Sequence, residues 1–529
     1  MFNPTLVHEY LRVNAQKHPE KEALIFGDQR YTYGMVDTLS DVFACRLIEG
    51  GLRRHDRVVL FLDNSPEAVI AIYGVLKAGG TFVALNGSLK ANKLSYILKD
   101  SGAKFLVSHV MKSGIVATAL ADSGSTAGLI WVGDGPVKSE ANGLPVSSWA
   151  EMVQDDSDGQ GARLLTLRKN VGGIDQDLAT LIYTSGSTGE PKGVMSSHFN
   201  MVSAARSIIQ YLENRPDDIT LTVLPLSFDY GLYQVIMAFM FGGTVVLERS
   251  FLYPVKFLEC IQRERVTGLP LVPTIAAMLL KMQSIDKYDL RSLRYVTNTA
   301  AALPVDHIQR LRSLLPHAKI YSMYGLTECK RVSYLPPEEV DRRPSSVGKA
   351  IPNSEVFIVN DAGEEVLPGV VGELVVRGAH VMRGYWNAPE LTRETFRPGR
   401  FPGEALLHTG DLFRKDEDGF LYFVGRKDDM IKSKGERISP REIENVLCKM
   451  DGVAEAAVIG IPDEVFGQVI KAFVVVKKGL SLSEREVLRH CAENLEFFMV
   501  PKSIEFPEDL PKTPNGKVDR KMLKDRGMN

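Results

Sequence analysis

The chain has 529 residues, of which 44% are hydrophobic and 24% charged, and its formal net charge is −2. This length is enough for about three to four folding units, and the composition is ordinary for a globular protein. Because a nucleic-acid partner would require a basic surface, the near-zero net charge predicts none. The N-terminus carries His8, Glu9 and Arg12 where an export signal needs an unbroken apolar stretch, so we predict no signal peptide.

The cysteines and the most apolar stretch bear on the compartment. The cysteines form no C-x-x-C pair and no metal-ligand spacing with histidine, which predicts buried, reduced thiols and a cytoplasmic protein. Residues 233–247 contain the pair Gly242 and Gly243 and fall short of the roughly 20 residues that a bilayer requires. We therefore predict a core helix, a glycine turn and a buried strand there, and no membrane span. The cysteines are Cys45, Cys260, Cys329, Cys448 and Cys491.

From about residue 55 onward, apolar strand-like runs alternate with helix-length segments. Residues 57–62 and 81–85 predict strands on either side of a helix over residues 66–78. This is the pattern of a βαβ unit in a largely parallel sheet with helices on its faces. Short strands with frequent turns between about 336 and 424 predict a smaller β-rich subdomain. Further strands are predicted at residues 220–224, 244–247, 268–272 and 294–297.

A domain boundary is predicted in the charged, turn-prone strip of residues 425–437. A helical pattern follows from residue 440 to 450, and strand and helix patterns continue beyond it as a compact α+β unit of about 100 residues. The predicted fold class is therefore α/β. A large N-terminal domain of layered sheets with flanking helices, including the β-rich subdomain, covers residues 1–425, and a small α+β C-terminal domain covers residues 426–529.

A loop rich in hydroxyl groups and glycine follows the apolar run of residues 178–182. Glycine lets the backbone approach a ligand closely, hydroxyl groups donate hydrogen bonds to phosphate oxygens, and Lys192 adds a positive charge. The segment is not a Walker A loop, because no Ser or Thr follows the lysine. Such a segment is also typical of an ordinary turn. The candidate phosphate-binding residues are Thr184, Ser185, Gly186, Ser187, Thr188, Gly189 and Lys192.

Two later segments supply other groups that a nucleotide needs. Residues 324–328, Tyr-Gly-Leu-Thr-Glu, follow a predicted strand and offer an aromatic face for a base, a hydroxyl for a phosphate and a carboxylate for Mg²⁺. Asp411 is predicted at a glycine turn after a strand, where α/β proteins bind the ribose hydroxyls of a nucleotide. Either segment alone also fits a turn that has no ligand.

Lys517 lies near the C-terminus on a loop that contains two prolines and a glycine. Its ammonium is charged at neutral pH and can bridge two anions, such as a substrate carboxylate and the α-phosphate of ATP. Those anions otherwise repel each other and prevent attack. The alternative is a solvated basic tail.

Taken in order, these segments resemble the adenylate-forming superfamily, which includes acyl- and aryl-CoA synthetases, luciferase and the adenylation domains of nonribosomal peptide synthetases. The resemblance spans about residues 20–525. It implies that the enzyme activates a small-molecule carboxylic acid with ATP and Mg²⁺, releases pyrophosphate and passes the acyl group to a thiol. The matching motifs are residues 184–193, 324–328, 409–411, 425–437 and 511–517.

The resemblance also implies how the nucleotide is bound. The loop from Thr184 to Lys192 is expected to wrap the β- and γ-phosphates. Tyr324 is expected to lie against adenine, Thr327 to meet the α-phosphate and Glu328 to help hold Mg²⁺. Thr327 and Glu328 are thereby candidate catalytic residues, with Lys517.

The same resemblance implies a mobile C-terminal domain. Asp411 and Arg426 are expected to bind the ribose, and Lys517 is expected to drive the first half-reaction. The small domain is then expected to rotate about Asp428 as its hinge. This rotation removes the lysine and brings the strip around Gly435 to the site, which admits the pantetheine thiol for the second half-reaction.

The acyl pocket is expected around Phe228 and Asp229. Many acyl-CoA synthetases have histidine where Phe228 falls, whereas amino-acid-activating domains often have Phe-Asp, with the aspartate binding the substrate ammonium. Asp229 therefore leaves an amino-acid substrate open, although residues 324–328 look more like the fatty-acyl branch, and we expect an acyl or aryl acid. Ala301 and Ala302 correspond to a wall of small residues in the family's pocket, or they pack at a strand end.

The acceptor is expected to be coenzyme A, with the phosphopantetheine arm of a carrier protein as the alternative. No carrier domain follows Asn529, so a carrier protein is expected to act in trans. A noncatalytic nucleotide-binding paralogue is a third alternative. The presence of Glu328, Asp411 and Lys517 argues against it, because a protein that had lost activity would be expected to lack one of them.

Overall fold

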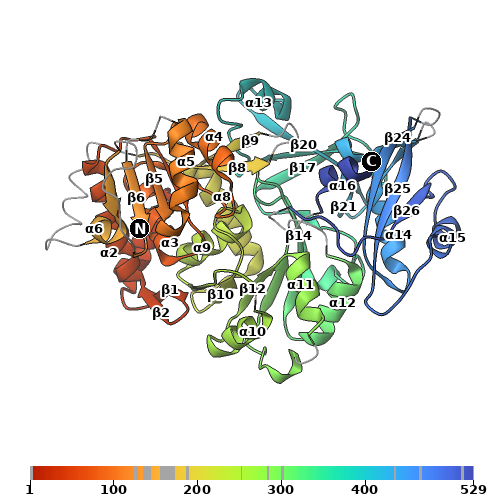
Figure 1. The fold of residues 1–529 in the computed structure, drawn as a ribbon, viewed down its shortest axis with the longest axis horizontal. Coiled ribbons are helices and arrows are strands. Elements are labelled where there is room, and N and C mark those ends of the chain that lie inside the picture. The colour runs from red at the N-terminus through yellow and green to blue at the C-terminus, as the bar shows by residue number, and fades with distance from the viewer. Residues whose placement is uncertain are drawn as a thin grey trace. The chain divides into compact units, whose positions relative to one another are not determined.

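The computed structural model describes residues 4–123, 126, 128–134, 144–154, 173–185, 190–251, 253–282, 285–299, 303–433, 436–463, 467–513 and 518–527. Their helices and strands form an α/β fold (Figure 1). The chain divides into two compact units, each described by itself below. Unit 1 comprises Met1–Glu338, Ala350–Glu355 and Arg377–Leu407, and unit 2 comprises Glu339–Lys349, Val356–Val376 and His408–Asn529.

A seven-stranded sheet lies in unit 1. Its strands in spatial order are β7 (Val146–Ser148), β6 (Gly128–Val132), β5 (Phe105–His109), β3 (Arg57–Phe61), β4 (Thr81–Ala84), β8 (Leu178–Ser185) and β9 (Pro191–Ser197). The strands from β7 to β8 pair in parallel, and β9 pairs antiparallel with β8 in a hairpin. Helices α4 (Ala91–Ser101) and α5 (Ser113–Ser123) cover one face, because Leu94 and Val116 pack in one buried cluster with Leu106 of β5.

A nine-stranded sheet contains the parallel strands predicted downstream. Its order is β16 (Lys349–Ala350), β15 (Ser333–Leu335), β14 (Lys319–Tyr324), β13 (Tyr295–Asn298), β12 (Gly268–Leu271), β10 (Ile219–Thr222), β11 (Thr244–Leu247), β1 (Glu22–Phe26) and β2 (Gln29–Thr32). The strands from β14 to β1 pair in parallel, and β15 and β2 pair antiparallel with their neighbours. The parallel strands end at one edge, where an α/β protein binds its ligand.

The helices of unit 1 begin where the sequence supplies capping groups. Helix α3 (Pro66–Lys77) starts with proline after Ser65, whose hydroxyl accepts the N–H of Ala68 at 3.3 Å. Helix α9 (Asp229–Phe241) ends at Gly242 before β11, which confirms the helix, glycine turn and strand predicted for residues 233–247. The others are α1 (Val7–Lys17), α2 (Tyr33–Glu49), α6 (Trp149–Val153), α8 (His198–Leu212), α10 (Pro254–Arg263), α11 (Pro273–Leu280), α12 (Val305–Leu314) and α13 (Pro389–Thr395).

The remaining strands form two five-stranded sheets. One has the order β17 (Ser354–Val359), β18 (Gly372–Gly378), β20 (Ala405–Lys415) and β19 (Phe396–Pro398), with β21 (Leu421–Arg426) also paired to β20. The other lies in unit 2 and has the order β23 (Glu436–Ile438), β22 (Ile431–Ser433), β25 (Gly467–Val476) and β24 (Val453–Asp463), with β26 (Ser503–Glu505) paired to β25. Its helices are α14 (Pro440–Lys449), α15 (Glu484–Asn494) and α16 (Arg520–Gly527).

All five cysteines lie in the described residues, and none forms a disulfide. Four are buried as predicted, but Cys448 on α14 is exposed, so the prediction of burial was wrong there. The reason is helical geometry. Ile443 and Leu447, four residues apart, form the buried face of α14, and Cys448 is turned away from that face. None of the described helices is long and apolar enough to cross a membrane.

Candidate active site

The β8–β9 hairpin carries both ends of the predicted phosphate loop. Thr184 on β8 pairs with Lys192 on β9, so both lie in strands rather than in the loop itself. The ladder extends this far because threonine and tyrosine favour strand geometry. The hydroxyl of Tyr183 ties the hairpin to α4 by donating to Asp100 at 2.5 Å. Ser185 ends β8, whereas Gly186, Ser187, Thr188 and Gly189 lie outside the described residues.

A segment around Tyr385 lies against β9 and connects it to Glu328. The N–H of Trp386 donates to the carbonyl of Gly193 at 2.8 Å, and Tyr385 forms a β-bridge with Val194. The hydroxyl of Tyr385 then donates to Oε1 of Glu328 at 2.7 Å. One tyrosine therefore joins the hairpin to the carboxylate that was predicted to hold Mg²⁺.

Tyr324 is the last residue of β14, and the turn that follows presents Thr327 and Glu328; all three are half-buried. Glycine is required at position 325, because a Cβ there would lie 2.2 Å from the carbonyl oxygen of Lys330. Within the described residues, no group of three or more His, Cys, Asp and Glu side chains could hold a metal ion.

Lys330, two residues after Glu328, was not anticipated from the sequence. Its side chain is 2% exposed, and no described residue accepts a hydrogen bond from its Nζ. The ammonium lies 5.2 Å from the ring centre of Tyr233. Burial lowers the pKa of Lys330 to about 8, and the carboxylates of Asp229 and Glu328 act in the opposite direction. The next residue, Arg331, is also buried but donates to the carbonyl of Lys330 at 3.1 Å.

The first turn of α9 carries the predicted pocket residues Phe228 and Asp229. Phe228 is the N-cap, and Asp229 is the first helical residue and is buried. A negative side chain at a helix N-terminus is favoured by the helix dipole. The hydroxyl of Tyr230 donates to the carbonyl of Thr297 at 3.0 Å and so joins this turn to the end of β13. Ala301 and Ala302 lie outside the described residues.

In unit 2, Asp411 and Arg426 lie opposite each other on β20 and β21. Nε of Arg426 is 3.1 Å from Oδ1 of Asp411. The prediction of a glycine turn before Asp411 was wrong, because β20 continues through this position. Gly410 stays in the strand with a φ of 69°, a conformation that glycine adopts without strain. The structure therefore brings together the two residues predicted to bind ribose.

Glu373 on β18 fixes the backbone beside Asp411. Its Oε1 accepts the N–H of Gly410 at 3.1 Å, and its Oε2 lies 3.7 Å from Nδ1 of His408, an ion-pair distance. Nζ of Lys427 lies 3.5 Å from the same Oε2 of Glu373. The His408 side chain and the N–H of Gly410 lower the pKa of Glu373 to about 2, against the opposite effect of burial.

The predicted hinge residue Asp428 is exposed, in a 3₁₀ helix (Lys427–Asp429) that follows β21. The hairpin of β22 and β23 comes next, and Gly435 between these strands lies outside the described residues. Lys517 also lies outside them. Before and after the segment that contains it, Lys512 and Val518 form an antiparallel bridge.

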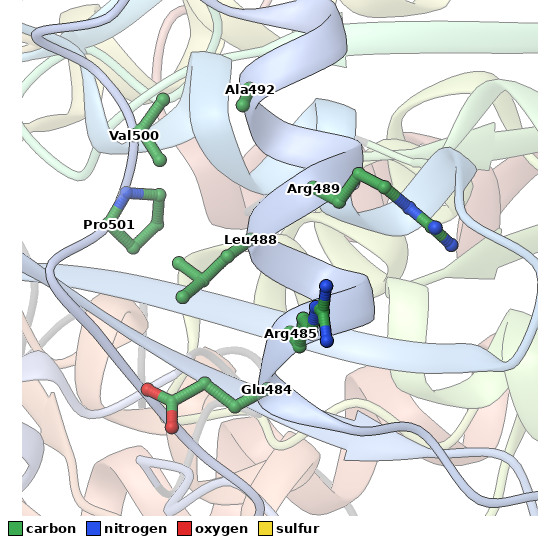
Figure 2. A pocket seen from close by; sticks show the side chains of 7 residues that line it. All are labelled: Glu484, Arg485, Leu488, Arg489, Ala492, Val500 and Pro501. Carbon is green, nitrogen blue, oxygen red and sulfur yellow. The ribbon is translucent and has the colours of Figure 1, made fainter.

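A groove of about 530 Å³ lies on unit 2, between α15 and the chain near residue 500 (Figure 2). Leu488 and Pro501 contribute apolar surface, and Arg485 and Arg489 extend from α15 (Figure 2). None of the residues that line the groove belongs to the predicted site.

The chain matches the family described as AMP-binding enzyme over residues 11–386, and the AMP-binding enzyme C-terminal domain over residues 442–517. A long-chain-fatty-acid–CoA ligase of Bacillus subtilis (strain 168) is 32% identical over 542 residues, which are 98% of this chain and 94% of that protein. A linear gramicidin synthase of Brevibacillus parabrevis is 30% identical over 521 residues, which are 98% of this chain but 6% of that protein.

Among solved structures, an anthranilate CoA ligase in complex with anthranoyl-AMP superimposes with a TM-score of 0.87. It is 27% identical, and the match covers 99% of this chain and 98% of that one. The family match spans well over half of the chain, and the resemblance inferred from the motifs is confirmed. The chain belongs to the AMP-binding enzyme family, and it is an AMP-forming acid–thiol ligase of the adenylate-forming superfamily.

Proposed function

We propose that this enzyme joins a small-molecule carboxylic acid to AMP, releases pyrophosphate, and transfers the acyl group to the thiol of coenzyme A. A carboxylate is a poor electrophile, whereas its mixed anhydride with AMP is open to attack by a thiol. Catalysis of this kind is mainly positioning and charge neutralisation. Support comes from the connection between β9 and Glu328 through Tyr385, which holds the hairpin of the phosphate loop close to a carboxylate suited to Mg²⁺.

The residues at Glu328 fit a magnesium ion. Mg²⁺ is commonly bound through one or two carboxylates together with substrate phosphates and water. Glu328 supplies one half-buried carboxylate, and the adjacent Thr327 supplies a hydroxyl. Mg²⁺ bound there would neutralise charge on the triphosphate. Tyr385 orients the carboxylate of Glu328 in advance.

The remaining nucleotide contacts are assigned from the motifs. The loop from Thr184 to Lys192 takes the β- and γ-phosphates, and the ring of Tyr324 takes the adenine. Asp411 takes the ribose hydroxyls, and the ion pair with Arg426 holds its carboxylate in position. Each role uses a group that suits its partner: hydroxyls and an ammonium for phosphate, an aromatic face for a base, and a carboxylate for hydroxyls.

The two half-reactions use different parts of unit 2. Lys517 bridges the substrate carboxylate and the α-phosphate in the first. Rotation about Asp428 then replaces it with the strip around Gly435, beside which the pantetheine thiol enters. Exposure of Asp428 in a single-turn 3₁₀ helix agrees with a position that can absorb a change of backbone angles.

The second candidate function is activation of an amino acid and its transfer to a separate carrier protein. The observation that favours it is Asp229, a buried carboxylate on the first turn of α9 that could bind an ammonium group. The similarity to the linear gramicidin synthase points the same way. If this alternative is wrong, the substrate is an acid without an ammonium group, and Asp229→Ala should leave activity on it largely intact.

A pyrophosphate-release assay over fatty, aryl, dicarboxylic and amino acids, with and without coenzyme A, tests the proposal. We expect release with one class of acid and an acyl-CoA product when the thiol is present. Glu328→Gln, which keeps the shape but removes the charge, should lower release on the order of 10²-fold. ATP-dependent release that yields no thioester with coenzyme A would contradict the proposed acceptor, and no release with any acid would contradict the reaction.

A further inference from the structure

The surroundings of the Lys330 ammonium differ from those of Lys77, the other buried lysine among the described residues. Lys77 is 1% exposed, and its Nζ donates to the carbonyl oxygen of Asp37 at 2.7 Å and lies 2.6 Å from Oδ1 of Asp41. Lys330 is buried to the same degree, yet none of the described residues accepts a hydrogen bond from it. A buried charge without hydrogen bonds is strongly unfavourable. The surroundings of Lys330 are therefore those of a group that binds a ligand, and not those of a lysine that stabilises the fold.

A second polar group beside Lys330 also lacks a partner. The ring of Tyr233 lies 5.2 Å from the ammonium, and its hydroxyl, on a residue 1% exposed, has no hydrogen-bond partner in the described part of the chain. Buried hydroxyl groups are normally hydrogen-bonded. The Lys330 ammonium lies against the ring whose hydroxyl is unpaired, so two unpaired donors, on α9 and on the turn after β14, belong to neighbouring side chains and point to an acceptor that is supplied by a ligand.

Arg331 supplies the comparison within the same turn. It too is buried, but it donates to the carbonyl of Lys330 and lies 3.4 Å from Oγ1 of Thr299, and its guanidinium stacks 4.8 Å above the ring of Tyr230. Arg331 thus has protein acceptors for its Nη1, although its Nε has none among the described residues, whereas Nζ of Lys330, its only side-chain donor, has no described acceptor.

The buried charges near Lys330 do not cancel. Asp229 carries one negative charge, and Lys330 and Arg331 carry two positive charges, which leaves one positive charge over. Glu328 also acts on Lys330, but it is half-buried and is assigned to Mg²⁺. A ligand that brings one negative charge into this cluster would balance it.

We propose that Lys330 and the hydroxyl of Tyr233 form an anion-binding subsite of the acyl pocket, and that the acid activated by this enzyme carries a second carboxylate besides the one that reacts. This inference rests on the proposed function and adds the class of the acid. The reacting carboxylate is left to Lys517, and the second carboxylate accepts from Nζ of Lys330 and from the hydroxyl of Tyr233. A hydrocarbon chain at this point would leave both donors unpaired, so unsubstituted fatty acids are disfavoured.

The test compares matched pairs of acids in the pyrophosphate-release assay: succinate with butyrate, glutarate with pentanoate, and adipate with hexanoate. We expect the wild-type enzyme to prefer the diacid of at least one pair. Lys330→Met should lower kcat/KM for that diacid on the order of 10² to 10³-fold, the usual effect of removing one partner of a buried charged pair. It should change kcat/KM for the monoacid of the same length much less.

Tyr233→Phe is the second variant, because it removes only the hydroxyl. We expect a loss on the order of 10-fold that is confined to the diacid. Tyr73→Phe is its matched control, because the hydroxyl of Tyr73 is also buried without a described partner but lies on α3. That control should leave the ratio of diacid to monoacid unchanged.

The outcomes separate this inference from the function on which it rests. Preference for monoacids or for amino acids in the wild-type enzyme would overturn the subsite and leave the ligase reaction intact. Equal loss on both members of a pair in Lys330→Met would also overturn it, because the lysine would then serve the reacting carboxylate or the nucleotide. Absence of pyrophosphate release with every acid would overturn the ligase function itself.

Discussion

Glu328 is held by a neutral donor. Among the described residues, the hydroxyl of Tyr385 is the only group that donates to its side chain, at 2.7 Å. An arginine in that place would pair with the carboxylate and compete with a cation, whereas a phenol fixes its direction and leaves its negative charge in place. Asp411 is held differently, by the guanidinium of Arg426 at 3.1 Å. The first arrangement suits a metal ion, and the second suits a neutral hydroxyl.

Tyr385→Phe tests this role of Glu328. Loss of the orienting hydrogen bond should raise the Mg²⁺ concentration that gives half-maximal pyrophosphate release by about 10-fold or more, since groups behind a metal ligand commonly alter affinity by that factor. Excess Mg²⁺ should restore most of the rate. Tyr422→Phe, which removes a hydroxyl that donates to Asp416 at 3.0 Å, is the control. A lower rate in Tyr385→Phe that no Mg²⁺ concentration restores would contradict the positioning role.

Glu373→Gln should show how much the ion pair with His408 stabilises the fold. The pKa of Glu373 in the folded protein is about 2, below its usual 4.5, so its charged form stabilises the folded state above about pH 4.5. At pH 5.5 the glutamine variant should lose about 3 kcal/mol of the free energy of unfolding. The difference from the wild type should shrink as the pH falls from 4.5 towards 2. Urea unfolding at pH 5.5, 4 and 3 measures it, and a constant difference would refute the assignment.

At the scale of elements, the sequence predicts regular strands and helices well where an apolar pattern is strong. The βαβ unit of β3, α3 and β4, the strands from β10 to β13, and α14 are where the pattern predicts them. Prediction from the pattern fails where contacts with residues distant in the sequence decide the local structure. β20 runs on through Gly410 because β21 and β18 hold its backbone, and no local signal reports those partners. Helix α16 forms from a basic segment because Leu523 is buried against the sheet of unit 2.

The same limit applies to the site. Tyr324, Thr327, Glu328, Asp411 and Arg426 are predicted to be site residues because each belongs to a short motif that is local in the sequence. Lys330 and Arg331 carried a signal of their own, two adjacent cations directly after Cys329, but a pair of charged residues is usually solvated. Tyr385 and Glu373 gave none, because their roles depend on contacts with residues 57 and 37 positions away in the chain.

Gly325→Ala tests the turn after β14 as an element. A Cβ would lie 2.2 Å from a backbone carbonyl oxygen, which cannot move as a side chain can, so the turn must shift. We expect the free energy of unfolding to fall by about 1 to 3 kcal/mol and pyrophosphate release to fall further than stability explains. Gly114→Ala on α5 is the control, because a Cβ there meets nothing within 4 Å. It should be neutral or stabilise by about 0.5 to 1 kcal/mol. Equal behaviour of the two variants would show that the turn tolerates a side chain.

At the scale of the whole molecule, the proposed groups belong to two units. Tyr324, Glu328 and the β8–β9 hairpin lie in unit 1, while Asp411, Arg426, Asp428 and Lys517 lie in unit 2. The proposed reaction needs both, and it needs unit 2 in two successive arrangements. Because the two half-reactions are proposed to use different residues of unit 2, we expect that a mutation can impair one of them and spare the other.

Lys517→Ala should lower formation of the acyl-adenylate on the order of 10² to 10³-fold, the usual effect of removing one preorganised charge. It should spare thioester formation from an acyl-AMP that is supplied ready-made. Lys512→Ala, five residues earlier and paired with Glu455 at 3.0 Å, is the matched control and should affect neither step. Equal loss in both half-reactions would refute a lysine that acts only in the first.

The exposed cysteine on α14 offers a way to observe unit 2 directly. Four of the five thiols are buried, so a maleimide dye should react selectively at Cys448. Protein atoms around the thiol raise its pKa to about 11, so labelling should proceed faster at mildly alkaline pH than at neutral pH. With a second dye on an engineered cysteine in unit 1, the efficiency of energy transfer between the two dyes would measure the distance between them. When ATP, the acid and coenzyme A are added in turn, a change in transfer efficiency at a given step would show that unit 2 has moved relative to unit 1 at that step.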